Sequence, residues 1–314
     1  MVNYMVYGHN LNFDSIDYEN VISRSIKFIH DYRIKLDRDG LLLGLSGGLD
    51  SAVIAKLCVM AEGKENVKAL ILPEKDSGKK NISDAVDYAK ELGIKYKKIN
   101  ITPFVKKFGL YRSFFLNNLP LLRSQRNNLM EKLNNKFEKK TGVSPFESGL
   151  CGIRSDKYAN FLKKANAYFR VKHRIRMLLL YKYAELENRM VVGAANKTEK
   201  MIGFFVKHGC DHATDIMPIL GLYKAQVKIL AQRLHLPQKF TQKDPSPDIM
   251  PGMTDEKLIG MEYDLLDRIL YLIEKEEKTE SISSQLDCDI KKVSLVNSLV
   301  NKSHHMREVY DLKY

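Results

Sequence analysis

The chain has 314 residues, of which 44% are hydrophobic and 28% charged, and 51 Lys and Arg against 38 Asp and Glu give a net charge of +13. This composition excludes a disordered chain, and no apolar run approaches the roughly 18 residues that a membrane helix needs. The four cysteines are too few and too scattered for a disulfide framework, and the first ten residues lack the features of a secretion signal. We therefore expect a protein of the reducing cytoplasm that does not enter a membrane.

The N-terminal third of the chain alternates between helix and strand patterns. Apolar residues at helical spacing predict a helix over 16–36, and the run LLLGL predicts a buried strand over 41–45. Both patterns then recur, with helices over 51–62 and 81–92 and strands over 67–73 and 94–101. This βαβαβ order implies a parallel sheet with right-handed crossovers.

The rest of the chain is mostly helical, with one irregular stretch. Residues 102–155 are rich in Asn, Lys and Phe and show no clear period, so we interpret them as a basic insertion with some helix. The later patterns predict a long helix over 156–188, a strand over 190–195, and helices over 223–234, 255–275 and 289–311. We assign residues 1–314 to one α/β domain whose C-terminal part, from about 254 to 314, is helical.

The positive charge is concentrated in one quarter of the chain. Residues 103–182 contain 18 Lys and Arg and four Asp and Glu, which leaves 33 basic and 34 acidic residues elsewhere. Such a block could be a solvated face, a collar around a phosphorylated small molecule or a footprint for RNA. Charge alone favours these three in that order, so nucleic acid is the least favoured partner.

A turn of small residues follows the first predicted strand. It consists of Gly44, Leu45, Ser46, Gly47, Gly48, Leu49, Asp50 and Ser51. The backbone N–H groups of a glycine pair can close on an anion where a helix begins, and the two serines add hydroxyl donors. The Asp50 carboxylate is a hard ligand that suits Mg²⁺. These features favour a pyrophosphate cradle over a turn that only packs the helix against the strand.

The pattern SGGxDS in this turn resembles the pyrophosphate loop of the N-type ATP pyrophosphatases. Four later segments resemble the ammonia-dependent NAD synthetases within that superfamily: residues 174–199, 203–218, 221–227 and 243–256. The resemblance covers roughly residues 20–101 and 166–310 and leaves the residues between them unmatched. It implies an adenine nucleotide alpha hydrolase-like fold, which is a Rossmann-like doubly wound parallel sheet.

The resemblance also implies a reaction, in which ATP and Mg²⁺ are used to amidate an acid. In the family, the carboxylate of deamido-NAD attacks the α-phosphorus of ATP, pyrophosphate leaves, and ammonia displaces AMP to give NAD. Free ammonia is the expected nitrogen donor, because no nitrilase-like glutaminase domain precedes the loop, and a homodimer is the expected assembly. A carboxylate nucleophile needs no general base, so alignment and charge neutralisation are expected to carry the catalysis.

Positions that match the family's motifs receive expected roles. Besides the turn at 44–51, the expected ATP contacts are Lys224 and Ser246, and the expected Mg²⁺ ligands are Asp50 and Glu199. Asp50 and Lys224 are the expected catalytic residues, since a lysine would offset charge on the leaving pyrophosphate. The expected contacts of the acid substrate are Arg174, Lys207, Asp215 and His305. From the residues alone, Arg174 and Lys224 could instead be solvated surface groups, and Glu199 could be a helix-surface acid.

The sequence departs from the family pattern at four ligand positions. Ala194 replaces a threonine, residues 208–213 replace a YGDGG turn, Arg170 replaces an asparagine and Met306 replaces a lysine. These departures leave open a related ligase that acts on another acid or carbonyl substrate, and an RNA-modifying enzyme is the third hypothesis.

Within the altered turn, His208, Cys210 and His212 alternate along the chain. An extended chain would put all three side chains on one side, where they could bind zinc. Alternatively, Cys210 could carry a persulfide in a thiolating enzyme. Without an evident fourth ligand, simple hydrogen bonding is the favoured interpretation.

Overall fold

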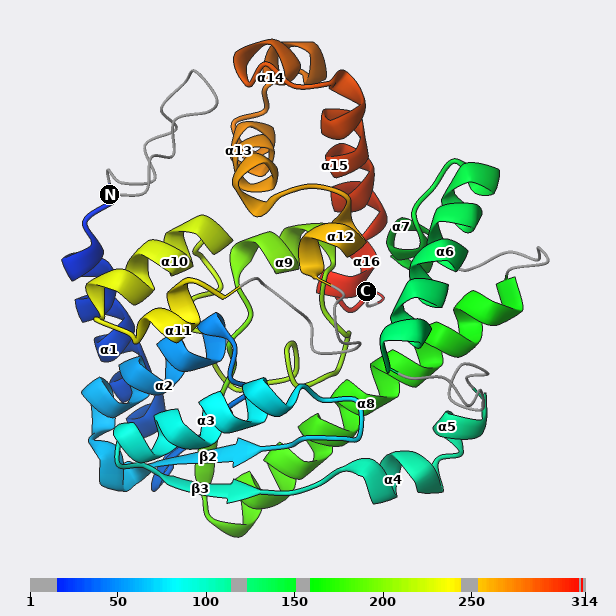
Figure 1. Ribbon diagram of the computed structural model, residues 1–314. Coiled ribbons are helices and arrows are strands. Elements are labelled where there is room, and N and C mark those ends of the chain that lie inside the picture. Colours follow the sequence, from blue (N-terminus) through cyan, green and yellow to red (C-terminus); the bar gives the residue numbers. More distant parts are fainter. Residues whose placement is uncertain (1–15, 114–122, 151–158, 244–253, 311, 313–314) are drawn as a thin grey trace.

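The computed structural model describes residues 16–113, 123–150, 159–243, 254–310 and 312. Four parallel strands form a sheet in the order β3-β2-β1-β4 (Figure 1). The strands are β1 (Gly40–Gly44), β2 (Val67–Ile71), β3 (Lys95–Lys98) and β4 (Arg189–Val192). The apolar runs of β1, β2 and β4 are buried, as expected for strands that are covered on both faces.

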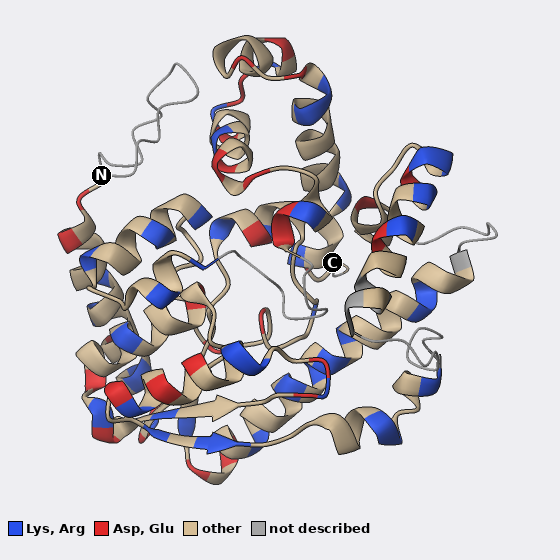
Figure 2. Ribbon diagram, viewed as in Figure 1, with Lys and Arg blue, Asp and Glu red and all other residues tan. Residues whose placement is uncertain are grey.

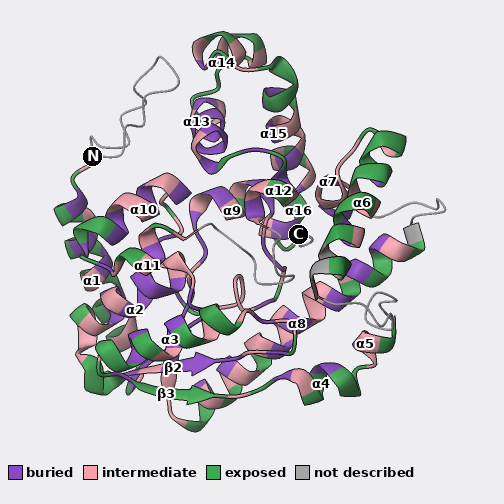
Figure 3. Ribbon diagram, viewed as in Figure 1, coloured by how far each residue is buried: buried purple, intermediate pink, exposed green. Residues whose placement is uncertain are grey.

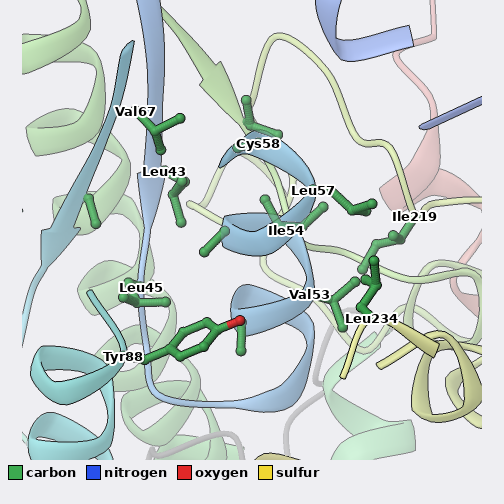
Figure 4. Packing of buried hydrophobic residues seen from close by; sticks show 14 of the residues in the cluster. Leu43, Leu45, Val53, Ile54, Leu57, Cys58, Val67, Tyr88, Ile219 and Leu234 are labelled. Atoms are coloured by element: carbon green, nitrogen blue, oxygen red, sulfur yellow. The ribbon is translucent and has the colours of Figure 1, made fainter. Parts of the chain in front are cut away.

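Four helices share a hydrophobic core with one face of the sheet. These are α1 (Tyr18–Lys35), α2 (Leu49–Glu62), α3 (Lys79–Glu91) and α10 (Lys224–Arg233), and the short 3₁₀ helix Lys64–Asn66 follows α2. Leu43 and Val67 from the sheet meet Ile54 and Leu57 of α2 in the core between these layers (Figure 4). Ile54 and Leu57 are fully buried, which explains why α2 is apolar on nearly all sides.

The other face of the sheet is covered mainly by α8 (Ala159–Leu186), a helix of 28 residues. The short helices α4 (Thr102–Lys107) and α5 (Leu110–Ser113) contact it. Because side chains alternate along a strand, Leu42 points to this face while Leu41 and Leu43 point to the first. The structure therefore confirms the doubly wound α/β fold.

The C-terminal helices form a third core, which packs against α10 and stands at the top of the view, away from the strands (Figures 1 and 3). They are α12 (Asp255–Ile259), α13 (Tyr263–Glu274), α14 (Thr279–Gln285), α15 (Ile290–Lys302) and α16 (His304–Arg307). Leu150 of α7 (Pro145–Leu150) and Ile202 of α9 (Lys197–Ile202) belong to the same core. The C-terminal part thus shares its core with earlier segments of the chain.

The structure differs from the sequence-based expectations in three places, and one of them is the helix expected over 289–311, which is interrupted at Ser303 between α15 and α16. Residues 102–155 contain four helices in their described part, including the 19-residue α6 (Arg123–Thr141), which we did not predict as regular. This helix has few apolar residues, so it shows little of the periodicity on which such predictions rest. The helix expected over 255–275 is split at Gly260, where a φ of 89° ends α12.

The division into one domain with a basic insertion stays a prediction. Figure 2 shows Lys and Arg distributed along α6 and α8 rather than gathered on a single helix. None of the described helices is both long and apolar enough to cross a membrane.

Candidate active site

The loop between β1 and α2 has the backbone geometry of an anion site. Gly47 has a φ of 81°, and a Cβ there would lie 2.1 Å from the Asn81 carbonyl oxygen. Only glycine fits, because L side chains avoid positive φ and the neighbouring backbone leaves no room. Gly48 is the N-cap of α2 and makes no side-chain cap, so N–H groups of the first helical turn remain available to a ligand.

Two serines hold this loop in place. The Ser51 hydroxyl donates to the Gly48 carbonyl oxygen at 3.0 Å, and the hydroxyls of Ser46 and Ser51 lie 3.0 Å apart. The backbone N–H groups of Ser46 and Gly48 donate to Ser51 Oγ and Ser46 Oγ at 3.3 and 3.2 Å. The loop conformation is therefore set by its own residues.

A cavity of about 690 Å³ opens beside the loop, at the carboxyl ends of β1, β2 and β4. This is a volume typical of small-molecule sites, and the carboxyl ends of the strands are where ligands bind in open α/β sheets. All residues of the predicted cradle except Gly47 line the cavity, as do Glu199 and Lys224. Ala194, one of the departures from the family pattern, also lines it.

Asp50, Glu199 and Lys224 come from three different helices and meet at the cavity wall. Lys224 Nζ lies 2.5 Å from Asp50 Oδ2 and 3.5 Å from Glu199 Oε1, and all three side chains are mostly buried. The Asn196 amide donates to Asp50 Oδ1 at 3.1 Å. The structure therefore brings together the residues for which the sequence predicts roles at the metal and the phosphates.

The position of Lys224 follows from how α10 begins. Its backbone N–H donates to the Thr198 hydroxyl at 2.9 Å, and the next N–H, from Ala225, donates to Asp267 Oδ2 at 2.8 Å. The first N–H groups of a helix have no partner within it. Here the side chains of α9 and α13 satisfy them, which fixes the end of α10 that carries Lys224.

Asp255 is a fourth ionic residue at this site, and the sequence analysis missed it. One carboxylate oxygen accepts a hydrogen bond from the Tyr263 hydroxyl at 3.0 Å. The other oxygen is buried and has no hydrogen-bond partner among the described residues. Asp255 lines the cavity, but it is 31 residues from Lys224 in the sequence and follows no motif, so only the fold reveals it.

Burial and mutual repulsion perturb the titration of these acids. Burial raises the pKa of Glu199 above its usual range, and Asp50 and Asp255 raise it further, against the opposing effect of Lys224. Burial also raises the pKa of Asp255 to about 6. The carboxylates outweigh burial at Lys224 and raise the pKa of its ammonium, which stays charged. Three carboxylates thus share one lysine, and such a site favours an added cation.

The residues expected to hold the acid substrate lie elsewhere. Arg174 Nε and Nη2 donate to the Lys207 carbonyl oxygen at 3.3 and 3.2 Å, and Lys207 Nζ donates to the His305 carbonyl oxygen at 2.7 Å. These three residues form a cluster, but none of them lines the cavity. Asp215 is separate, because its carboxylate accepts from the Val191 N–H at 2.7 Å and from the Tyr181 hydroxyl at 2.9 Å.

Other basic residues face the cavity instead. Arg170 and Arg176 line it and donate to the carbonyl oxygens of Gly149 at 2.7 Å and Leu72 at 3.1 Å. Arg174 therefore lies outside the cavity that Arg170 and Arg176 line. Lys243 also lines the cavity and donates at 2.9 Å both to the Gly47 carbonyl oxygen and to Asp84 Oδ2.

Ser246 lies outside the described residues. Met306 is buried in the C-terminal core, so the residue at this departure from the family pattern serves packing.

The sheet and its strand-to-helix loop place the chain among α/β proteins that bind phosphate groups at the carboxyl ends of parallel strands. The family model described as NAD synthase matches residues 21–138 and 122–310. The chain belongs to this family. The expectation that the residues between 101 and 166 fall outside the resemblance is therefore wrong, since the family model runs through them.

Individual relatives cover nearly the whole chain. It is 43% identical over 289 residues to the NH(3)-dependent NAD(+) synthetase of Thermotoga maritima, which is 92% of this chain and 96% of the relative. The enzyme of the same name from Methanocaldococcus jannaschii is 34% identical, over 92% of this chain and 94% of the relative. Among solved structures, an NMN synthetase from Francisella tularensis has a TM-score of 0.69 at 26% identity and covers 95% of this chain and 99% of its own.

Proposed function

We propose that this protein is an ammonia-dependent NAD synthetase, a ligase that uses ATP to amidate deamido-NAD. The observation that carries the proposal is the 43% identity to a curated enzyme of that name over 92% of the chain. The site supports it, because the cradle of residues 44–51 opens onto a cavity of suitable size beside a buried lysine.

We assign ATP to the β1–α2 end of the cavity. The N-terminus of α2 and the loop N–H groups hold its phosphates, and Lys224 lies where charge grows on the leaving pyrophosphate. Asp50 orients Lys224 through the 2.5 Å ion pair. The protein therefore aligns the phosphates and neutralises their charge, and no side chain is required to abstract a proton from a carboxylate nucleophile.

The acidic residues of the site fit Mg²⁺. Asp50 and Glu199 supply oxygen ligands. The buried Oδ1 of Asp255, which has no hydrogen-bond partner among the described residues, gives a third carboxylate oxygen at the same wall. When bound, Mg²⁺ neutralises phosphate charge and orients the leaving group. We infer that Asp255 belongs to this metal site.

We assign the acid substrate to the Arg174, Lys207 and His305 cluster. Because this cluster lies outside the cavity, we also infer that the protein is a homodimer with the nucleotide sites near the subunit boundary.

Cys58, Cys210 and Cys288 are free thiols, which supports a place in the reducing cytoplasm.

The test is a direct assay of the purified protein with ATP, Mg²⁺ and ammonium chloride. Deamido-NAD and nicotinate mononucleotide are supplied separately, and pyrophosphate and the amide product are measured. We expect NAD and pyrophosphate in equal amounts with deamido-NAD. The mononucleotide is included because the structural relative from Francisella tularensis is an NMN synthetase.

The comparison of the two acids decides the substrate. Turnover of the mononucleotide at a higher kcat/KM than deamido-NAD would reassign the substrate within the same chemistry. Absence of pyrophosphate release with both acids would refute the proposal.

A further inference from the structure

Three side chains with metal-binding atoms meet where the 208–213 turn contacts α8. They are His173 of α8 and the adjacent Cys210 and Asp211, and all three line the cavity. The side chains of His173 and Asp211 are only 17% and 27% exposed, and Cys210 is partly buried. Neither the nucleotide chemistry nor the Mg²⁺ site uses these residues.

The contacts around the imidazole exclude one reading of this cluster, a relay that activates the thiol. In a relay, the nucleophile and the acid bind opposite nitrogens of the histidine ring. Here both partners approach the same nitrogen, because Cys210 Sγ lies 3.7 Å and Asp211 Oδ1 lies 3.1 Å from His173 Nδ1. The Sγ, Oδ1 and Nδ1 atoms of these three residues therefore surround a common point.

The spacing of these atoms matches one face of a coordination tetrahedron. Cys210 Sγ and Asp211 Oδ1 are 3.8 Å apart, so the triangle has sides of 3.1, 3.7 and 3.8 Å. Bonds of about 2.0 Å to nitrogen or oxygen and about 2.3 Å to sulfur, at tetrahedral angles, place neighbouring ligand atoms roughly 3.3 to 3.6 Å apart. Small side-chain movements would bring all three atoms to these distances.

Backbone contacts already hold the ligands in position. The Val206 N–H donates to Asp211 Oδ2 at 3.0 Å, which leaves Oδ1 directed at the histidine. The Cys210 N–H donates to the His173 carbonyl oxygen at 3.2 Å and ties the turn to α8. Such supporting contacts are what orient the ligands of a metal site.

We propose that His173, Cys210 and Asp211 bind zinc, with a fourth position open to the cavity. A thiolate, an imidazole and a carboxylate together suit zinc and exclude Mg²⁺ and Ca²⁺, which take oxygen ligands. On binding, the Cys210 thiol and the His173 ring release their Sγ and Nδ1 protons to solvent. The ion would clamp the 208–213 turn onto α8.

This site differs from the zinc site that the alternation of His208, Cys210 and His212 along the chain suggested. Residues 209–213 form a turn rather than extended chain, closed by hydrogen bonds from His212 and Ala213 N–H to the Gly209 carbonyl oxygen. His212 is stacked on Phe205 with the ring centroids 4.9 Å apart. Cys210 consequently meets a histidine that is 37 residues away in the chain.

The experiment measures metal binding to the full chain, with zinc and cobalt as probes. Chelator-treated protein is titrated with Zn²⁺ against a chromophoric indicator, and Co²⁺ is followed by the sulfur-to-metal absorption in the near ultraviolet. We expect one zinc per chain in the wild type and at least a tenfold weaker affinity in Cys210→Ser and His173→Gln. Cys288→Ser, which changes a cysteine outside the cluster, should keep the wild-type affinity.

Two further variants and a structural control decide between sites. Asp50→Asn alters the Mg²⁺ site, which offers no sulfur, so its cobalt absorption should equal that of the wild type. Cys210→Ser must keep the far-ultraviolet circular dichroism and metal-free melting temperature of the wild type for its loss of binding to count; if it does not fold, the wild-type cobalt spectrum decides alone. A wild-type cobalt complex without sulfur absorption, or equal zinc affinity in a folded Cys210→Ser, would overturn the proposal. None of these readouts depends on NAD synthesis.

Discussion

At the scale of single residues, Asp50 connects the phosphate cradle of the candidate active site to Lys224. It pairs with Lys224, accepts from Asn196 and lies in the first turn of α2 beside the phosphate cradle. Its side chain is 17% exposed, so water screens the ion pair between Asp50 and Lys224 only weakly. Changes here should therefore affect catalysis more than folding.

We expect Asp50→Ala to lower the rate of pyrophosphate release by about 100-fold or more, because both the metal ligand and the partner of Lys224 are lost. The fold should survive, since alanine is favoured in a helix and Glu199 remains near Lys224. The measurement is steady-state turnover together with a thermal melt. Asp87→Ala on the exposed side of α3 is the matched control, and undiminished turnover in Asp50→Ala would defeat the magnesium assignment.

Arg174 tests the separate location of the acid substrate. We expect Arg174→Ala to raise the KM of deamido-NAD by roughly tenfold or more while the KM of ATP changes little, because a charged hydrogen bond to the acid substrate is removed. Substrate titrations of both ligands provide the comparison, with the exposed Arg233→Ala as control. Equal effects on the two KM values would place Arg174 outside the substrate site.

At the scale of elements, a buried ion pair joins α8 to the loop after β2. Lys172 Nζ lies 2.6 Å from Glu74 Oε1 and 3.3 Å from Asp76 Oδ2. The Lys172 and Glu74 side chains are 3% and 1% exposed, and Tyr111 donates to Glu74 at 2.8 Å. Because Pro73 and Ser77 of this loop line the cavity, the pair sets one wall of the site.

Replacing Lys172 should destabilise the protein, because Glu74 and Asp76 would lose the cation that pairs with them. We expect Lys172→Met to lower the free energy of unfolding by roughly 3 to 5 kcal/mol, the usual cost of leaving a buried charge unpaired. Urea unfolding measures the loss, and Lys182→Met at an exposed position of the same helix is the control. A second change, Glu74→Gln in the Lys172→Met background, should recover part of the stability. A loss below about 1 kcal/mol would mean that the pair is not a structural link.

At the scale of the whole molecule, several ion pairs join distant segments and make stability depend on pH. Burial alone would raise the pKa of Asp76, but Lys172, Tyr168 and Lys75 outweigh it, so the pKa lies below its usual value. The same balance lowers the pKa of Asp84, through Lys243 and Lys80, and the pKa of Glu187, through Lys68 and Arg189. A carboxyl whose pKa is lowered by folding stabilises the folded state above its ordinary pKa, and this contribution is lost as the pH falls through the lowered value.

We therefore expect the protein to lose stability as the pH falls below about 4. Asp76→Asn should be less stable than the wild type at pH 6, and the difference should shrink toward pH 3, because the carboxyl of the unfolded chain takes up a proton below its ordinary pKa of about 4. Urea midpoints at a series of pH values test this. A difference that is the same at pH 3 and pH 6 would contradict it.

The oligomeric state is a further whole-molecule prediction. Leu178 and Leu186 of α8 are 59% and 69% exposed, and a homodimer contact over this helix would cover them. We expect light scattering to give twice the chain mass of 36.1 kDa, and Leu178→Glu to shift the protein toward the monomer. A wild-type monomer at assay concentration would refute the homodimer.

The sequence by itself determined the features that depend on neighbouring residues. The cradle at 44–51 could be predicted because its glycines, its serines and the start of α2 are contiguous, and the buried strands because their apolar runs are unbroken. The family resemblance rested on the same short segments. Helix α6 escaped because a helix with few apolar residues leaves no periodic trace.

Only the tertiary structure decided which distant side chains share a site. The rotation of α8 about its axis turns Arg170 and Arg176 toward the cavity and leaves Arg174 outside it. The packing of α8 against the rest of the protein sets this rotation, and the spacing of the arginines in the sequence does not reveal it. The same packing delivers Asp255 to the Lys224 cluster and His173 to Cys210, across 31 and 37 residues of chain. Contacts at such separations depend on how the layers dock, which no local pattern encodes.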